Sequence, residues 1–150
     1  MDSLEMLYQQ IILDHSRHPR FYGKEESIIE HDCYNPLCGD EIQIYCKTKD
    51  GKIEHLTFTG KGCAICIASA SLMAEKLQGV SIEEFKEHFS WYTSLVKGEE
   101  VSGKLGKNIK LEVMQGVSKY PMRVKCATCA WHALEDAINN QEEENNEKNH

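Results

Sequence analysis

The spacing of apolar residues predicts a helix near the N-terminus of this 150-residue chain. Asp2 with Glu5 three residues later is a helix-start signal, and Pro19 marks the end. The apolar residues of this segment recur at helical spacing and lie on one face of the predicted helix: Leu4, Leu7, Tyr8, Ile11 and Ile12. His15 and His18 fall in or just after the last turn. We expect them to act as cations at the negative end of the helix dipole rather than as a metal-binding pair.

The pattern then changes to the alternation of a β-sheet. In residues 41–48 (EIQIYCKT) apolar and polar side chains alternate, and residues 53–60 (IEHLTFTG) return as a partner strand after the turn Asp50-Gly51. Residues 28–33 supply a possible further strand. We therefore predict an antiparallel sheet of about three strands.

Helical spacing resumes after Gly62, over residues 64–77, and a capping box at Ser81 and Glu84 begins another helix. Its apolar stripe consists of Ile82, Phe85, Phe89, Tyr92 and Val96. Residues 97–107 are rich in glycine and predict a mobile loop. A short helical piece over 109–115 and a last helix over 127–139 follow. The pattern predicts one α+β domain over residues 1–139, with the helices packed on one side of the sheet, and a disordered acidic tail over 140–150.

Composition narrows the possible partners and the compartment. The formal charge is −7, of which residues 140–150 contribute −3 through four Glu and one Lys. A negative body disfavours nucleic acid as the main partner. No apolar run approaches the length of a membrane span, and the N-terminus lacks a secretory signal pattern. We expect a cytoplasmic protein with reduced thiols. Its seven cysteines, an odd number, fit a disulfide framework poorly and favour metal or sulfur chemistry.

Two C-x2-C pairs, Cys63/Cys66 and Cys126/Cys129, suggest by spacing alone a closed zinc site of four cysteines. Both pairs, however, open into apolar helices. Cys66 and Cys129 fall on the apolar faces of these helices, so we expect them to be core thiols or neighbours of the site. Cys46, on the apolar side of a strand, has the same expectation, and the role of Cys33 stays open.

Cys63 and Cys126 differ because each lies at or just before a helix start, where free N–H groups favour a thiolate. Arg123 and Lys125 precede Cys126 and are expected to lower its pKa further. Both cysteines are therefore candidates for metal ligands or nucleophiles.

Cys38 joins them through the segment CGD. Pro36 stiffens the approach, and Gly39 lets the backbone turn so that Cys38 and Asp40 can face the same point, although a plain turn explains the segment equally well. The four candidates would form a tetrahedral site of three thiolates and one carboxylate: Cys38, Asp40, Cys63 and Cys126. Zinc accepts such a set, and the harder carboxylate is the exchangeable ligand.

Three ordered motifs, NPLCGDEI, GKGCAICIASASLMAE and YPMRVKCATCAW, resemble the IscU/NifU N-terminal family of iron–sulfur assembly proteins over roughly residues 5–139. The resemblance implies a three-stranded antiparallel sheet with helices on one side. It also implies a metal site at Cys38, Asp40, Cys63 and Cys126.

Within that family, Lys125 and the long segment 84–107 resemble the SufU branch, because IscU scaffolds typically carry histidine at the position of Lys125. This resemblance implies bound zinc and a PLP-dependent cysteine desulfurase of the SufS type as partner. Cys38 would accept persulfide with assistance from Arg123, and downstream iron–sulfur assembly proteins would receive the sulfur. The chain departs from both branches at Cys66 and Cys129, where the family motifs usually lack cysteine.

Three functions follow. The leading hypothesis is a zinc-dependent sulfur-transfer protein, which would count as an enzyme. The alternative is a scaffold on which an iron–sulfur cluster is assembled and passed on. The third is a structural zinc or thiol-redox domain. It is disfavoured because a redox CxxC is expected beside a βαβ pattern, and none is present.

Overall fold

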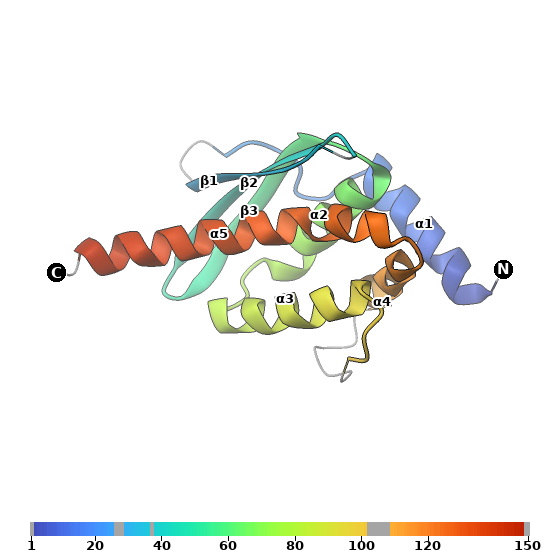
Figure 1. Cartoon of the computed structure of the whole chain (residues 1–150). Helices are drawn as coiled ribbons and strands as arrows, with labels where there is room; N and C mark the ends of the chain where they lie inside the picture. The colour runs from blue at the N-terminus through green and yellow to red at the C-terminus, as the bar shows by residue number, and fades with distance from the viewer. Residues whose placement is uncertain (1, 26–28, 37, 102–108, 149–150) are drawn as a thin grey trace.

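A computed structural model describes residues 2–25, 29–36, 38–101 and 109–148. The chain builds one sheet and a layer of helices (Figure 1). The elements run in the order α1 (Ser3–Arg17), β1 (Ile29–Asn35), β2 (Asp40–Lys49), β3 (Lys52–Lys61), α2 (Ala64–Leu77), α3 (Ile82–Val96), α4 (Ile109–Glu112), the 3-10 helices η1 (Val113–Lys119) and η2 (Pro121–Arg123), and α5 (Val124–Lys148). No described helix is long and apolar enough to cross a membrane.

The sheet is antiparallel in the order β1-β2-β3, so β2 is central and β1 is an edge strand. Asp50 and Gly51 join β2 to β3 with φ of 53° and 74°, the two positive values that a tight type I′ hairpin requires. In the first hairpin Asn35 pairs with Asp40. The end of β1 and the start of β2 therefore lie side by side.

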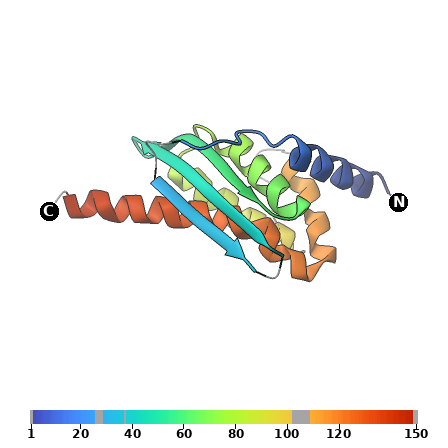
Figure 2. The ribbon, with the colours of Figure 1, turned by 90° about the horizontal axis from the view of Figure 1, so that it is seen from above.

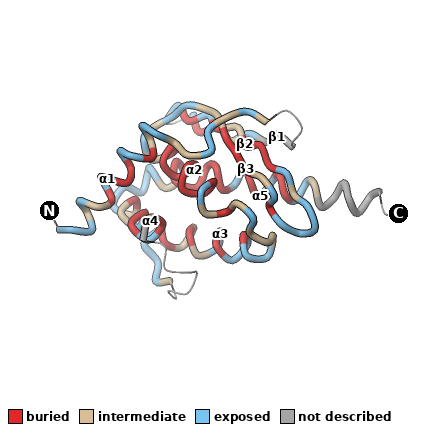
Figure 3. Tube along the Cα trace, turned by 180° about the vertical axis from the view of Figure 1, so that it is seen from behind, coloured by how far each residue is buried: buried red, intermediate tan, exposed pale blue. Residues whose placement is uncertain are grey.

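The helices cover one face of this sheet. Helix α5 packs on β1 and β2, and α2 packs on β3 and α5, while α1 and α3 lie outside them (Figures 1 and 2). The buried positions gather between the two layers, on α2, on β2 and β3, and on the first half of α5 (Figure 3). The prediction of an α+β domain with a three-stranded antiparallel sheet and helices on one side is confirmed.

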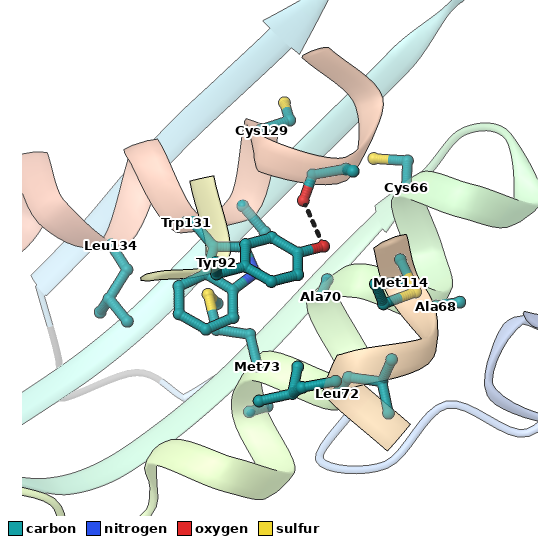
Figure 4. Close-up of a cluster of buried hydrophobic side chains, with 14 of the residues drawn as sticks. Cys66, Ala68, Ala70, Leu72, Met73, Tyr92, Met114, Cys129, Trp131 and Leu134 are labelled. Carbon is teal, nitrogen blue, oxygen red and sulfur yellow. Dashed lines mark hydrogen bonds between the residues drawn. The ribbon is translucent and has the colours of Figure 1, made fainter. Parts of the chain in front are cut away.

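Tyr92 of α3 and Trp131 of α5 anchor the core between the helices. Their rings stack with centroids 4.4 Å apart, and both side chains are fully buried beside Met73 of α2 (Figure 4). Cys66 and Cys129 lie at the upper border of the same cluster in this view. The part of α5 around Trp131 is therefore fixed by apolar packing from α2 and α3.

Helix boundaries differ from the prediction at the C-terminal end. Helix α5 begins at Val124 rather than 127, because Pro121 in η2 starts helical turns just before it. It continues to Lys148, so the backbone over 140–148 is helical where we expected a disordered tail. The Glu, Gln and Lys residues of this segment are good helix formers and extend a helix already nucleated by the body. The central part of the expected mobile loop, residues 102–108, lies outside the described residues.

His15 does not have the role we expected. It is fully buried, and its Nδ1 lies 2.8 Å from Ser71 Oγ on α2, while its Nε2 has no partner among the described residues. Burial lowers the pKa of His15, so the ring is held neutral rather than cationic. The prediction that His15 is a cation at the end of the helix is wrong, because α2 packs on the face of α1 that carries His15.

The expectation of seven reduced thiols is also wrong, because a disulfide joins Cys33 of β1 to Cys129 of α5. Helix α5 lies against β1, which brings the two Cα atoms to 5.6 Å, the usual separation in a disulfide. Cys129 is buried, as predicted for a core residue, but its sulfur is bonded. Cys33, left open in the sequence, is its partner.

Candidate metal centre

The first contributor to the site is the turn between β1 and β2. The Cys38 N–H donates to the Asn35 carbonyl over 3.3 Å, and Gly39 adopts a φ of 67°, a left-handed conformation that suits glycine. This turn brings Cys38 and Asp40 to the same end of the sheet. Cys38 is half-buried, whereas Asp40 is fully buried.

The second contributor is the junction of β3 and α2, where two glycines allow a close approach to β2. A Cβ at Gly60 would meet the Glu41 carbonyl oxygen at 2.1 Å, and one at Gly62 would meet Asp40 Oδ1 at 2.5 Å. With both side chains absent, the Cys63 N–H donates to Asp40 Oδ1 over 2.8 Å. The Gly-x-Gly motif thus brings Cys63 against Asp40.

Cys63 is also the N-cap of α2. Its Sγ accepts a hydrogen bond from the Cys66 N–H at 3.4 Å, and it lies 4.0 Å from Asp40 Oδ2. The sulfur is therefore at the positive end of the helix dipole, as the sequence predicted.

The third contributor is the first turn of α5. Cys126 is fully buried, and its Sγ lies 3.0 Å from Cys38 Sγ and accepts from Asn35 Nδ2 at 3.6 Å. Tyr92 Oη donates over 3.0 Å to the carbonyl of Ala127, the next residue, and Ser69 Oγ donates to the same oxygen. These buried contacts fix the turn that carries Cys126.

These three segments bring the predicted ligands together. The ligand atoms of Cys38, Asp40 and Cys126 all lie within 4.8 Å of one another, and Cys63 contacts this group through Asp40. Ligand atoms on tetrahedral zinc sit about 2.0–2.3 Å from the ion, hence roughly 3.5 Å from one another. The spacing and the donor set of three sulfurs and one carboxylate therefore fit such an ion.

Arg123 and Lys125, the two cations expected to lower the pKa of Cys126, lie differently relative to the site. Arg123 Nη1 donates to Cys38 Sγ at 3.2 Å, whereas Lys125 is exposed. The pKa of Arg123 is raised, first by its hydrogen bond to Cys126 and then by the electrostatic effect of Cys38. Arg123 is thus the cation placed on the site sulfurs.

The prediction that nearby cations lower the pKa of Cys126 is wrong for the metal-free site. Burial raises this pKa, and hydrogen bonds to Asp40 and Cys38 raise it further. The nearby cation and the helix start are outweighed by desolvation of the thiolate. A metal ion must displace the Cys126 proton when it binds.

The remaining thiols behave as core residues. Cys66 and Cys46 are buried free thiols, and burial raises the pKa of Cys46 to about 12. Burial also raises the pKa of Cys66, and Asp40, Cys63 and Cys38 raise it further, so this core thiol is a neighbour of the site. Two supporting residues escaped the sequence analysis. Asn35 had a signal, since it opens the motif NPLCGDEI, but Tyr92 was placed only in an apolar stripe.

The family model described as the NifU-like N terminal domain matches residues 7–148. The chain belongs to this family. Its expected membership, drawn from the three cysteine motifs, is confirmed.

Relatives of this NifU-like domain carry two kinds of name. The zinc-dependent sulfurtransferase SufU of Bacillus subtilis (strain 168) is 37% identical over 140 residues, covering 93% of this chain and 95% of the relative. The iron–sulfur cluster assembly scaffold protein IscU of Streptococcus pyogenes serotype M1 is 36% identical over 140 residues, covering 92% and 86%. Sulfur transfer and scaffold therefore both occur among similar proteins.

Solved structures agree with the fold. A SufU from Fervidobacterium islandicum AW-1, described as an iron–sulfur cluster assembly scaffold protein for the SUF system, superposes with a TM-score of 0.81 at 32% identity, covering 89% of this chain and 98% of that one. An N-terminal NifU-like protein from Brucella abortus gives 0.82 at 21% identity, covering 95% of this chain and 99% of that one, and supports the fold alone.

Proposed function

We propose that this NifU-like protein is a zinc-dependent sulfurtransferase. It accepts persulfide sulfur from a PLP-dependent cysteine desulfurase of the SufS type and passes it to downstream iron–sulfur assembly proteins. The observation that carries the proposal is the asymmetry of the site. Cys126 and Asp40 are fully buried, whereas Cys38 is half-buried and holds the exposed Arg123 on its sulfur. Cys63 is also half-buried. Cys38 is thus the partly exposed thiol of the set that also holds a cation on its sulfur, which makes it the better acceptor for a partner's sulfur.

Zinc suits this role because it favours the thiolate form of its ligands and has no redox chemistry of its own. The ligands would be Cys38, Asp40, Cys63 and Cys126. The relative named zinc-dependent sulfurtransferase SufU supports this choice of metal.

Cys38, Arg123 and Asp40 have different roles in the sulfur transfer. The Cys38 thiolate attacks the outer sulfur of the partner's persulfide, a new S–S bond forms on Cys38, and the partner's cysteine leaves as a thiolate. Arg123 donates to the sulfur of Cys38 and stabilises its negative charge before the attack. Asp40 is held by the Cys63 N–H, which keeps the carboxylate in place. We expect this transfer in the cytoplasm, where site thiols stay reduced.

The sulfur-transfer role is tested by Cys38→Ala. This variant should lose all stimulation of cysteine desulfurase turnover, measured as alanine formation, because the partly exposed thiol that Arg123 contacts is missing. Cys46→Ala is the matched control, since Cys46 is a buried core thiol on β2, and it should stimulate like the wild type. Full stimulation by Cys38→Ala would contradict the proposal.

The second candidate is a cluster scaffold, which the name of the streptococcal relative favours. Three cysteines and a carboxylate can also hold a labile iron–sulfur cluster. Anaerobic purification followed by metal, acid-labile sulfide and visible-spectrum measurements separates the two. Zinc without sulfide supports the transferase, whereas iron with equal sulfide and a coloured spectrum supports the scaffold.

A further inference from the structure

Four cysteines lie in succession on a path from the rim of the metal centre to the edge strand β1: Cys38, Cys126, Cys129 and Cys33. Cys38 Sγ lies 3.0 Å from Cys126 Sγ. Cys129 follows Cys126 by three residues on α5, a spacing that places both side chains on one face of the helix. Cys129 is bonded to Cys33 on β1. The disulfide thus begins one helical turn beyond the metal ligand Cys126 on α5.

The strand side of the path has the same arrangement. Asn35 contacts Cys126 Sγ through its amide, and Cys33 precedes it by two residues on β1. Side chains two apart on a strand share a face and lie roughly 6–7 Å apart. Cys33 and Asn35 therefore both point toward α5. Cys33 forms the disulfide with Cys129, and Asn35 contacts the metal ligand Cys126.

We propose that Cys33 and Cys129 are a redox-active dithiol that reduces the sulfur carried on Cys38 and releases it as sulfide. This inference rests on the proposed function, because it requires a persulfide on Cys38. The structure holds the oxidised form of the pair, which is the product of that reaction.

The steps balance in atoms and electrons. Cys126 gives up its proton and its sulfur takes the outer sulfur of the Cys38 persulfide, and Cys38 leaves as a thiolate that can accept that proton. The Cys129 thiolate then attacks Cys126 Sγ, so that an S–S bond forms between them and hydrosulfide leaves. The Cys33 thiolate finally attacks Cys129 Sγ and frees Cys126. Overall, one persulfide and two thiols yield one thiol, one disulfide and one molecule of hydrogen sulfide.

Burial suits the two ends of this path to different tasks. Cys126 and Cys129 are almost completely buried, so a persulfide between them is shielded from solvent and from other thiols. Cys33 is half-buried on the edge strand β1. An external dithiol, of the small-molecule or protein class, can reach Cys33 there and restore the reduced pair.

The experiment uses the full-length protein, reduced and kept without oxygen. A purified cysteine desulfurase with limiting cysteine loads it, and the desulfurase and excess reagents are removed. Sulfide is then measured over time without added reductant. Intact and peptide mass spectra follow the gain of one sulfur on Cys38 and the loss of two hydrogens as Cys33 and Cys129 join.

Wild type should release about one sulfide per loaded persulfide while the Cys33–Cys129 disulfide forms. Cys33→Ser and Cys129→Ser should retain sulfur until a dithiol is added, with release slowed about tenfold or more because the positioned second thiol is missing. Cys46→Ser, which removes a buried thiol of β2, should match wild type. Cys33 is half-buried, so its variant serves if Cys129→Ser does not fold, as judged by circular dichroism.

Each other outcome is informative. The inference is overturned if a loaded persulfide gives no disulfide, or if both serine variants release sulfide as fast as wild type. The Cys33–Cys129 disulfide would then only stabilise the fold. If no persulfide forms on Cys38, the proposed function fails first, and the mass spectra distinguish that failure from the others.

Discussion

Replacing Gly62 with alanine should weaken zinc binding without unfolding the protein. A Cβ at this position would lie 2.5 Å from Asp40 Oδ1 and 3.1 Å from Asp40 Cα. The Asp40 carboxylate must then move away from the Cys63 N–H, which now donates to it over 2.8 Å. The backbone of Gly62 itself is not left-handed, so alanine adds no conformational strain there.

The size of the effect follows from the bond that is lost. A hydrogen bond to a charged group contributes about 1.5–3 kcal/mol, which corresponds to roughly a ten- to hundredfold loss of zinc affinity if the ligand is displaced with it. Affinity is measured by competition of the metal-free protein with a chromophoric chelator. The midpoint of thermal unfolding of the metal-free variant should fall by several degrees, because the same hydrogen bond is lost there, but the variant should still fold.

Gly23→Ala is the matched control, because a Cβ there would meet no atom within 4 Å and its φ is not positive. Asp40→Ala completes a double-mutant cycle. If Gly62 acts through Asp40, adding Gly62→Ala to Asp40→Ala should cost little further affinity. Wild-type affinity in Gly62→Ala, or full additivity in the cycle, would refute the reasoning.

Three further predictions concern the supporting residues. Because burial lowers the pKa of His15 in the folded state, the unfolded state binds more protons just below the ordinary histidine pKa of about 6.5, so the free energy of unfolding should fall as pH drops through that value. His15→Gln should flatten this pH dependence in urea unfolding, and an unchanged slope would contradict it. Tyr92→Phe should lose about 1 kcal/mol of stability, because it removes one of the two donors to the Ala127 carbonyl; denaturant unfolding measures this, and a wild-type midpoint would count against the bond. Arg123→Gln should slow desulfurase-coupled sulfur uptake by about tenfold, because the charge-assisted bond to Cys38 is lost. Lys119→Gln, which removes an exposed cation paired with Glu5, should leave uptake unchanged, and equal rates in both variants would exclude a special role for Arg123.

The sequence predicted the parts of the fold and of the site that depend on local geometry. The Asp50-Gly51 turn, the helix start at Cys63 and the turn around Gly39 are each set by residues a few positions apart, and the structure has all three. The convergence of Cys38, Asp40 and Cys126 was expected from the family resemblance as well as from ligand chemistry.

Features that depend on packing between distant segments could not be predicted. Cys33 and Cys129 are separated by 96 residues, and only the docking of α5 on β1 makes them neighbours. His15 has the spacing of a helix-end cation, yet the face it occupies is decided by α2. The Cys126 pKa was misjudged for the same reason, since nearby charges are visible in a sequence but the cost of burying a thiolate is not.

The distribution of the metal ligands along the chain also constrains how the protein matures. The turn before β2 and the junction before α2 are neighbours within the β-sheet, but Cys126 belongs to α5, the last helix, which packs on β1, β2 and α2. During synthesis the ligand set is therefore incomplete until α5 has emerged and docked. The proposed metal ion would therefore bind late. Because an ion bound only by the native fold shifts the folding equilibrium toward that fold, its binding would stabilise the protein at the last step of maturation.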